Sequence, residues 1–260
     1  MPSLTAARDA QDVKQIWLIK NKKEKGKRMT SYYIGLSLLS NNQGGTAVSR
    51  KNSRSEARRV LSLLEGRSIE DDEIAKGENG RPFFPDCHAD FSISHSGNLA
   101  AVSLVSTQNR GGGVLRTGCD VQLVRPRIKM REIAEEYFHS AERDYIFTPG
   151  ESSFDLTRFY QIWTLKECYI KLRGHSVFDM ARVPSFIRGD AAFGPLPDRL
   201  QCNLYELADA DGHYILAAAV EGDAELLPEI RWYSQSSLPC RSTAEIKAAL
   251  SPLETVNPKR

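Results

Sequence analysis

The sequence has no long apolar run, few cysteines and little net charge, and each scarcity excludes a class of protein. The longest apolar stretch, residues 214–220, is far shorter than the roughly 20 residues of a membrane-spanning helix, so it indicates a strand. The five cysteines are scattered and contain no Cys-x-x-Cys pair, which argues against a disulfide framework or a structural zinc site and favours a cytoplasmic location. The first nine residues lack a basic segment followed by an apolar one, so we expect no secretory signal.

The remaining composition is that of an ordinary globular protein. Of the 260 residues, 41% are hydrophobic and 26% are charged, and this excludes collagen-like, disordered and coiled-coil classes. At about 150 residues per domain, the length suggests one large domain or two small halves. A glycine-rich connector at 106–118 is the expected boundary. We therefore predict an N-terminal half (1–112), a C-terminal half (113–235) and a C-terminal extension (236–260).

Hydrophobic periodicity predicts two long helices and several strands arranged as hairpins. We expect helices over 53–65, 133–145, 156–172 and near 244–250, with Gly66 and Gly174 ending the first and third. We expect strands over 91–96, 99–105, 118–124, 204–207, 214–220 and 230–233. A helix, a loop and a hairpin thus occur twice in similar order.

Two basic clusters, at 14–28 and 50–59, make the charge uneven. The plain interpretation of each is a solvated surface, although Arg54 and Arg58 would lie along one flank of the first long helix. A polyanion- or RNA-binding protein is the alternative from another functional class. The sequence pI of 8.2 lies below the value of about 9 typical of such proteins, and no aromatic residues alternate with the basic ones.

Three polar groups stand out because they interrupt apolar elements. Asp120 lies inside a strand, where a carboxylate is costly unless it is paired or metal-bound, or else caps a turn at the strand end. Glu167 and Lys171 are four residues apart on a helix, so they project from one face, either as a surface pair or at the edge of a cleft. Residues 94–96, Ser-His-Ser, lie on a strand, where adjacent side chains point to opposite faces, so they are no nucleophile–base pair. A Ser-His hydrolase is also disfavoured because the chain has no Gly-x-Ser-x-Gly segment.

Taken together, these groups form a specific pattern of four sequence blocks. The blocks are Gly-x-x-Gly-Arg-Pro at 77–82, Phe-Ser-Ile-Ser-His-Ser-Gly at 91–97, Gly-Cys-Asp-Val at 118–121 and Phe-Tyr-x-x-Trp-x-x-Lys-Glu-x-x-x-Lys-x-x-Gly at 159–174. Their order and spacing resemble the 4′-phosphopantetheinyl transferases, specifically the larger single-chain branch of the surfactin-synthetase-activating type. The resemblance is strong over residues 76–174. It implies an α+β fold of two similar α/β halves related by a pseudo-two-fold axis, each with a long helix on a small, mainly antiparallel sheet.

The resemblance also implies an activity and a set of residue roles. These enzymes transfer the 4′-phosphopantetheine group of coenzyme A to a carrier-protein serine and release 3′,5′-adenosine bisphosphate, with Mg²⁺ as cofactor. Asp120 and Glu167 match metal ligands, a role that suits Mg²⁺. Glu167 also matches the proposed base and Lys171 the lysine that stabilises the departing phosphate, so both are candidate catalytic residues. The implied coenzyme A contacts are Arg58, with Arg54 or Lys51 as further candidates beside it, and Arg81, Ser94, His95 and Lys171.

Gln122 departs from the family pattern, which usually has a second carboxylate two residues after the first. It shares a face of the strand with Asp120 and can still ligate Mg²⁺ through its amide oxygen, although it adds no negative charge. We therefore expect a working site with weaker metal affinity; the alternative is a catalytically degenerate, coenzyme A-binding relative.

The implied partner is an acidic acyl, aryl or peptidyl carrier protein domain. The expected contact region is the helix over 133–145 with the loop at 148–156, where Tyr137, Phe138 and Phe147 are either apolar anchors or core residues. We expect no nucleic-acid or membrane partner. Two halves in one chain favour a monomer.

Overall fold

The structure is a computed structural model of the chain. It describes residues 30–38, 46–77, 79–85, 89–107, 115–147, 154–188, 191–192, 200–208, 212–221, 228–233 and 240–241. The predictions for the basic cluster at 14–28 and for a helix near 244–250 lie outside these residues.

The first sheet is built around a strand, a long helix and a hairpin. β1 (Thr30–Leu38) is followed by α2 (Thr46–Glu65) and then by the hairpin of β4 (Ala89–Ser96) and β5 (Leu99–Thr107). The strand order is β11-β1-β5-β4, in which β11 (Glu229–Trp232) pairs parallel with β1 and the other pairs are antiparallel. The helix ends where predicted, because Gly66 takes the left-handed backbone conformation (φ 72°).

The second sheet repeats the same order of elements. β6 (Thr117–Leu123) precedes α5 (Leu156–Arg173), and the hairpin of β9 (Leu200–Ala208) and β10 (His213–Glu221) follows. The strand order is β12-β9-β10-β6, with β12 (Cys240–Arg241) at one edge and β6 at the other. Asp155 caps the N-terminus of α5 by accepting the Arg158 N–H, and Gly174 ends the helix as predicted (φ 68°).

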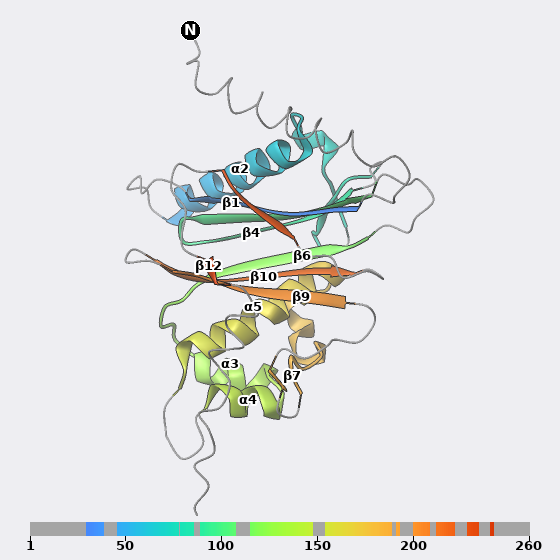
Figure 1. The fold of residues 1–260 in the computed structure, drawn as a ribbon. Helices are drawn as coiled ribbons and strands as arrows, with labels where there is room; N and C mark the ends of the chain where they lie inside the picture. Colours follow the sequence, from blue (N-terminus) through green and yellow to red (C-terminus); the bar gives the residue numbers. More distant parts are fainter. Residues whose placement is uncertain are drawn as a thin grey trace, which may run out of the picture.

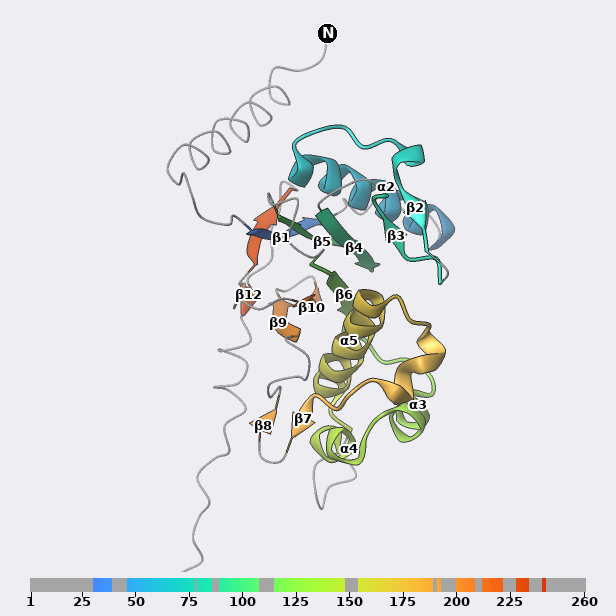
Figure 2. The same cartoon turned by 90° about the vertical axis from the view of Figure 1, so that its right-hand side faces the viewer.

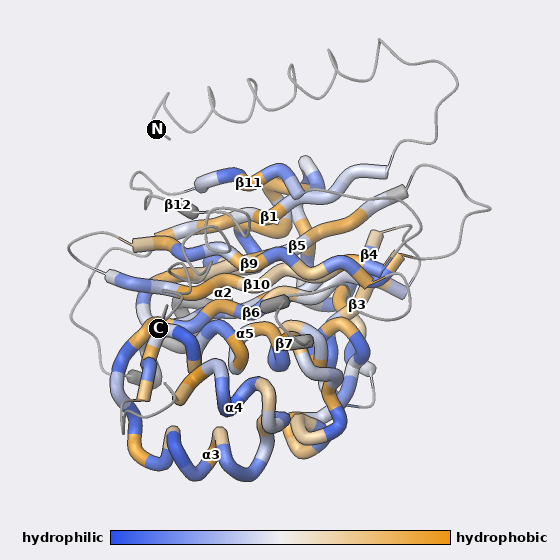
Figure 3. The backbone as a smooth tube through the Cα atoms, turned by 60° about the horizontal axis from the view of Figure 1, so that its bottom comes forward, coloured by the Kyte–Doolittle hydropathy of each residue, from blue (hydrophilic) through white to orange (hydrophobic). Residues whose placement is uncertain are grey.

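The two sheets and their helices form four layers (Figure 1). Alternate residues of β1 face the second sheet, so Tyr32, Ile34 and Leu36 join Tyr205 and Leu216 in a core between the sheets. A second core lies between α2 and the first sheet, and a third surrounds α5 on the second sheet. In Figure 3 the hydrophobic colour gathers on the central strands, while α3 (Met130–Tyr137) is largely hydrophilic.

The helix predicted over 133–145 is instead two short helices, α3 and α4 (Ser140–Ile146). Phe138 is extended and buried at the break, and Glu142 accepts the backbone N–H of His139 in a capping box that starts α4. The break changes the direction of the chain, so that α4 packs against α5 (Figure 2).

Short elements complete the described structure: η1 (Asp71–Glu73), β2 (Ala75–Lys76), β3 (Pro82–Phe83), η2 (Val177–Arg182), β7 (Ile187–Arg188) and β8 (Ala191–Ala192). The strand predicted over 230–233 exists as β11, but it completes the first sheet although it follows the β9–β10 hairpin of the second sheet in sequence. In the part of the chain that the structure describes, no helix combines the length and apolar character needed to cross a membrane.

Candidate functional site

The predicted metal ligands lie on two elements in close contact, β6 and α5. Gly118 permits this approach, because a Cβ atom there would lie 2.4 Å from the Cys168 carbonyl oxygen and 2.8 Å from Leu172 Cβ. Asp120 follows two residues later on β6, and Glu167 lies on the facing helix. The two carboxyl groups are near enough to repel one another.

Asp120 is almost completely buried, at 2% exposure, and three side chains bind it. Lys171 Nζ lies 2.6 Å from Oδ1, and Ser94 Oγ donates to the same oxygen at 2.7 Å. Gln122 Nε2 donates to Oδ2 at 2.9 Å, so Gln122 does share the face of Asp120 as the sequence predicted. The structure thus brings Ser94, Asp120, Gln122, Glu167 and Lys171 together.

The charges of Glu167 and Lys171 respond to this arrangement. Burial and the repulsion from Asp120 raise the pKa of Glu167 to about 7, although Lys171 acts in the opposite direction. Burial alone would lower the pKa of Lys171, but the attraction of Asp120 outweighs it and the pKa is raised. Lys171 is therefore a cation at neutral pH, and Glu167 can gain or lose a proton there.

Polar side chains on β4 bind the backbone of β6, the strand that carries Asp120. β6 is an edge strand, and side chains of β4 bind its backbone N–H groups: Asp90 Oδ2 accepts from Thr117, Ser94 Oγ from Val121 and Ser96 Oγ from Leu123. The distances are 2.8, 3.2 and 2.9 Å. Polar residues at every second position of β4 thus join the two sheets.

His95 lies on the opposite face of β4 from Ser94. Phe91 and Ile93, which share its side of the strand, pack toward α2, the helix that carries Arg58. The side chains of His95 and Arg58 are half-buried. The structure thus separates His95 and Arg58 from the Asp120 cluster, and Lys51 and Arg54 have side chains outside the described part.

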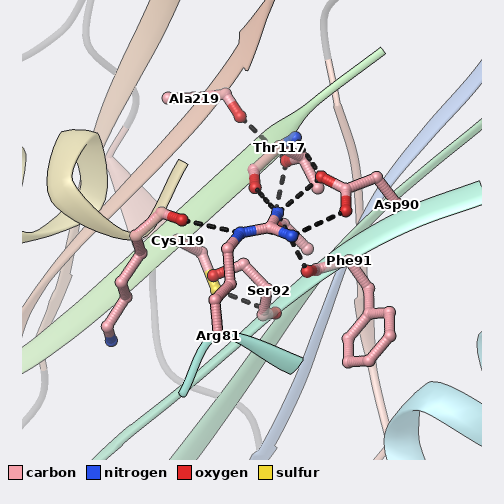
Figure 4. A network of polar contacts seen from close by, with 9 residues as sticks. Arg81, Asp90, Phe91, Ser92, Thr117, Cys119 and Ala219 are labelled. Carbon is pink, nitrogen blue, oxygen red and sulfur yellow. Dashed lines mark hydrogen bonds and ion pairs between the residues drawn. The ribbon is translucent and has the colours of Figure 1, made fainter. Parts of the chain in front are cut away.

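Arg81 differs most from its sequence-based role, because its guanidinium is used within the protein (Figure 4). It forms a two-pronged ion pair with Asp90, at 2.9 and 2.6 Å, and donates from Nε to the Lys171 carbonyl oxygen at 2.8 Å. It also donates to the carbonyl oxygen of Thr117 at 3.0 Å. The side chain is only 17% exposed and its hydrogen bonds are made within the protein, while a coenzyme A contact by Arg81 stays a prediction.

Sequence reasoning missed the residues that support the site. Asp90 and Thr117 were not singled out, although the alternation of Asp90, Ser92, Ser94 and Ser96 in an otherwise apolar strand was a usable signal. The buried ion pair between Lys166 and Glu142, at 3.0 Å, was also missed, because nothing in the spacing connects residues 24 positions apart.

The predicted carrier anchors have mixed outcomes. Phe138 is 3% exposed and stacks on Phe159 at 5.4 Å between ring centroids, so it belongs to the core. Tyr137 and Phe147 are half-buried against the same core. Most of the loop predicted to join them, 148–153, lies outside the described residues.

Comparisons with known proteins concern the same part of the chain. Residues 116–219 match the family model of the 4′-phosphopantetheinyl transferase superfamily, a range that includes Asp120, Gln122, Glu167 and Lys171. The 4′-phosphopantetheinyl transferase AcpT of Escherichia coli K12 is 35% identical over 117 residues, covering 44% of this chain and 54% of that protein. The 4′-phosphopantetheinyl transferase pptA of Paxillus involutus is 27% identical over 203 residues, covering 72% and 76%. The 4′-phosphopantetheinyl transferase gsp of Aneurinibacillus migulanus is 29% identical over 103 residues, covering 40% and 38%.

The matches support this superfamily and an enzyme of the 4′-phosphopantetheinyl transferase kind. The chain spans about half the length of the first curated relatives that it matches. The match to gsp covers less than half of either chain, so it does not single out a branch of the superfamily.

Proposed function

We propose that this chain transfers the 4′-phosphopantetheine group of coenzyme A to a serine of a carrier protein and releases 3′,5′-adenosine bisphosphate. The observation that carries the proposal is the cluster of Asp120, Glu167 and Lys171 on β6 and α5. All three residues lie in the segment that matches the superfamily. The cluster combines a buried carboxylate, a second carboxyl group beside it and a lysine that binds the first carboxylate.

The donor set fits a magnesium ion. Burial, and then repulsion from Asp120, raises the pKa of Glu167, and a cation beside the two carboxyl groups would relieve this repulsion. A pair of carboxyl groups suits Mg²⁺, because this ion usually takes one or two carboxylates together with substrate phosphates and water. When bound, Mg²⁺ would neutralise the pyrophosphate of coenzyme A.

The residues of the chain supply the remaining chemistry. The serine hydroxyl of the carrier forms a bond to the phosphorus next to pantetheine, and the bond from that phosphorus to the bridging oxygen of adenosine bisphosphate breaks. Glu167 accepts the hydroxyl proton at a carboxylate oxygen, because a pKa of about 7 leaves a large fraction ionised at neutral pH. Lys171, a cation held by Asp120 and Ser94, stabilises the negative charge on the departing phosphate.

The alternative, a catalytically degenerate relative, rests on Gln122, which stands where the family usually has a second carboxylate. In the structure its amide nitrogen binds Asp120, so it restrains this carboxylate as well as standing where the family has a second acid. We expect Gln122→Glu to lower the Mg²⁺ concentration needed for half-maximal transfer, because the variant adds a negative charge at the site. An unchanged magnesium requirement would place Gln122 outside the coordination shell.

Coenzyme A is proposed to span the two halves. The reactive pyrophosphate end lies at the Asp120 cluster, and the 3′-phosphate of adenosine lies toward Arg58 and His95, on the α2 side of the first sheet. The equal order of elements and equal strand pairing around β5 and β10 support halves related by a pseudo-two-fold axis, as in the surfactin-synthetase-activating branch. A cytoplasmic monomer remains the simplest expectation.

An acidic carrier protein is proposed to contact the start of α3. The segment at 125–131 carries four cations and Ile128, which is 89% exposed. Beside it, Met130, Phe154 and Leu156 help to line an open hollow of about 400 Å³. A basic rim around an apolar hollow suits an acidic surface with one apolar anchor.

The direct test is the mass of an apo carrier protein after incubation with this protein, coenzyme A and Mg²⁺, with EDTA as control. We expect a gain of one phosphopantetheinyl group that EDTA prevents and that Asp120→Ala and Glu167→Ala abolish. Near-normal transfer by both variants would contradict the assigned site. Coenzyme A binding without transfer to any of several carriers would instead favour the degenerate relative.

A further inference from the structure

The short hairpin of β2 and β3, in the N-terminal half, contacts the C-terminal end of α5. Its turn is closed by hydrogen bonds from Gly77 N to the Arg81 carbonyl oxygen and from Gly80 N to the Gly77 carbonyl oxygen, both 2.9 Å. Asn79 then donates from Nδ2 to the Gly174 carbonyl oxygen at 2.7 Å, and Arg81 donates from Nε to the Lys171 carbonyl oxygen at 2.8 Å. Two carbonyl groups at the helix end are thus bound by the other half of the protein, the one of Lys171 in addition to a 3.3 Å hydrogen bond from the Gly174 N–H.

Arg81 also fixes the strand that carries Asp120. Its ion pair with Asp90 orients that carboxylate so that Oδ2 accepts the Thr117 N–H at 2.8 Å, while Arg81 Nη2 donates to the Thr117 carbonyl oxygen at 3.0 Å. Thr117 in turn donates from Oγ1 to the Ala219 carbonyl oxygen of β10 at 2.8 Å. Figure 4 shows the bonds from Asp90 and the Thr117 carbonyl converging on the Arg81 guanidinium group, with Thr117 in turn bound to Ala219.

The Arg81 side chain therefore binds the backbone of both β6 and α5, the two elements that carry the reactive cluster. Thr117 lies three residues before Asp120 on β6, and the Lys171 carbonyl belongs to the residue whose ammonium group binds Asp120. A planar guanidinium has a fixed fork of donors and can bind several acceptors at once, which an ammonium cannot do with the same geometry. The Asp90 side chain is 8% exposed, so this arrangement excludes water from most of the pair.

We propose that Arg81 and Asp90 are positioning residues: their ion pair, with Asn79, clamps the end of α5 to the start of β6 and so fixes Lys171 and Glu167 relative to Asp120. The inference rests on the proposed transferase function for its catalytic consequence, but the clamp itself is a property of the structure. It differs from the role implied by the family resemblance, in which Arg81 contacts coenzyme A.

The two roles predict opposite kinetic effects. If Arg81 positions the cluster, Arg81→Lys lowers kcat by about tenfold or more, because small misplacements of reacting groups are costly, while the Kd of coenzyme A changes by less than about twofold. Asp90→Asn should act in the same way. A rise of about tenfold in the Kd of coenzyme A, with kcat unchanged at saturation, would overturn the proposal and restore the coenzyme A contact.

Two further variants guard against loss of folding. Asn79→Ala removes only the exposed contact to Gly174, so it should fold normally and lower kcat by a smaller factor, again with unchanged coenzyme A affinity. Arg67→Lys is the matched control, because Arg67 forms a comparable ion pair with Glu73, at 2.5 Å, on the surface of the same half. Equal losses in Arg67→Lys and Asn79→Ala would overturn the clamp.

Hydrogen–deuterium exchange separates the clamp from the activity. We expect faster exchange at the last turn of α5 and at Thr117 in Arg81→Lys and Asp90→Asn, and no change there in Arg67→Lys. Unchanged exchange in all three variants would refute the clamp. Absence of transfer by the wild-type protein would refute the proposed function, while the exchange result would still decide whether the clamp exists.

Discussion

Glu167 experiences opposing influences that make its charge sensitive to pH. Burial and Asp120 raise its pKa to about 7 from an ordinary value of 4.5, against a smaller effect of Lys171. The folded protein therefore holds a proton that the unfolded chain has already lost between these two values. Stability from this group is fully present below about pH 4.5 and is lost as the pH rises through about 7. At about 1.4 kcal/mol per pKa unit, the loss is at most about 3.5 kcal/mol.

We expect Glu167→Gln to remove this part of the pH dependence of unfolding. The variant cannot ionise, so the metal-free protein should gain stability relative to wild type as the pH rises from 5 to 8. Urea unfolding at several pH values, without metal, measures the difference. Mg²⁺ should then stabilise the wild type more at pH 8 than at pH 5, because it favours the ionised carboxylate. A difference between the two proteins that does not vary with pH would contradict the raised pKa.

The residues of the reactive cluster were predictable because polar side chains in apolar elements are unusual. Asp120, Glu167 and Lys171 were found in this way, and alternation along the strand placed Gln122 beside Asp120. The role of Arg81 was not predictable, because its partners Asp90, Thr117 and Lys171 come from three elements whose contact depends on the tertiary fold.

At the scale of elements, Gly118 determines how closely α5 lies on β6. Replacing it with alanine would force a Cβ against the Cys168 carbonyl oxygen and Leu172, both parts of the helix. We expect Gly118→Ala to cost about 1–3 kcal/mol in the free energy of unfolding and to reduce transfer strongly, because the helix must move away from Asp120.

Gly35 provides a matched control for this prediction. A Cβ atom there would lie 2.4 Å from Val60 Cγ1 of α2, so Gly35→Ala overpacks the corresponding strand and helix of the first half. Because the atom that opposes Gly35 belongs to a side chain, whereas Gly118 faces backbone atoms, chemical unfolding should show a loss of stability no larger than that of Gly118→Ala, with kcat near the wild-type value. Equal losses of kcat in the two variants would mean that general destabilisation, and not helix position, reduces activity.

The buried pair of Lys166 and Glu142 fixes α4 against α5. Both side chains have 0% exposure, and Glu142 also accepts the backbone N–H groups of His139 and Phe186, at 2.9 and 3.0 Å. Lys166→Met should cost about 3–5 kcal/mol, because it leaves the buried Glu142 carboxyl group without its partner. Adding Glu142→Gln should recover only part of this loss: it removes the unpaired charge, but the single amide oxygen of Gln can replace only one of the two carboxylate oxygens that accept from His139 and Phe186. Denaturant unfolding of the single and double variants checks both expectations.

Local elements were easier to predict than their breaks and partners. The ends of α2 and α5 followed from Gly66 and Gly174, and the hairpins followed from alternation. The break at Phe138 was missed because hydrophobic spacing continues through it, while the capping bonds of Glu142 and the burial of Phe138 favour two helices. The parallel pairing of β11 with β1 could not be read from a short strand, because it depends on sheet edges that the sequence does not identify.

At the scale of the whole molecule, the shared core between the sheets should make the described fold unfold as one unit. Leu61 lies in the core under α2, and Trp163 packs against the core around α5, on the far side of both sheets. We expect Leu61→Ala to cost about 2–5 kcal/mol and to shift the unfolding midpoint seen by Trp163 as much as the midpoint seen by circular dichroism.

Fluorescence of Trp163, in a variant with Trp17→Phe and Trp232→Phe, makes this measurement specific. Coincident curves support a single cooperative transition. A shift confined to the circular dichroism signal would show that the halves unfold independently in spite of the residues that they share between the sheets.

The crossing of β11 has a consequence for dividing the chain in two. A cut between β5 and β6 would leave β1 with an unpaired edge in the first fragment, and the second fragment would carry the strand that fits it. The parallel register, with Tyr33 opposite Glu229 and Leu36 opposite Trp232, would make their recombination selective. The first fragment carries β1 without β11, and the second carries β11 without β1, so the native pairing forms only when the two different fragments meet. The two pieces would therefore serve as a split reporter whose signal depends on their reassembly.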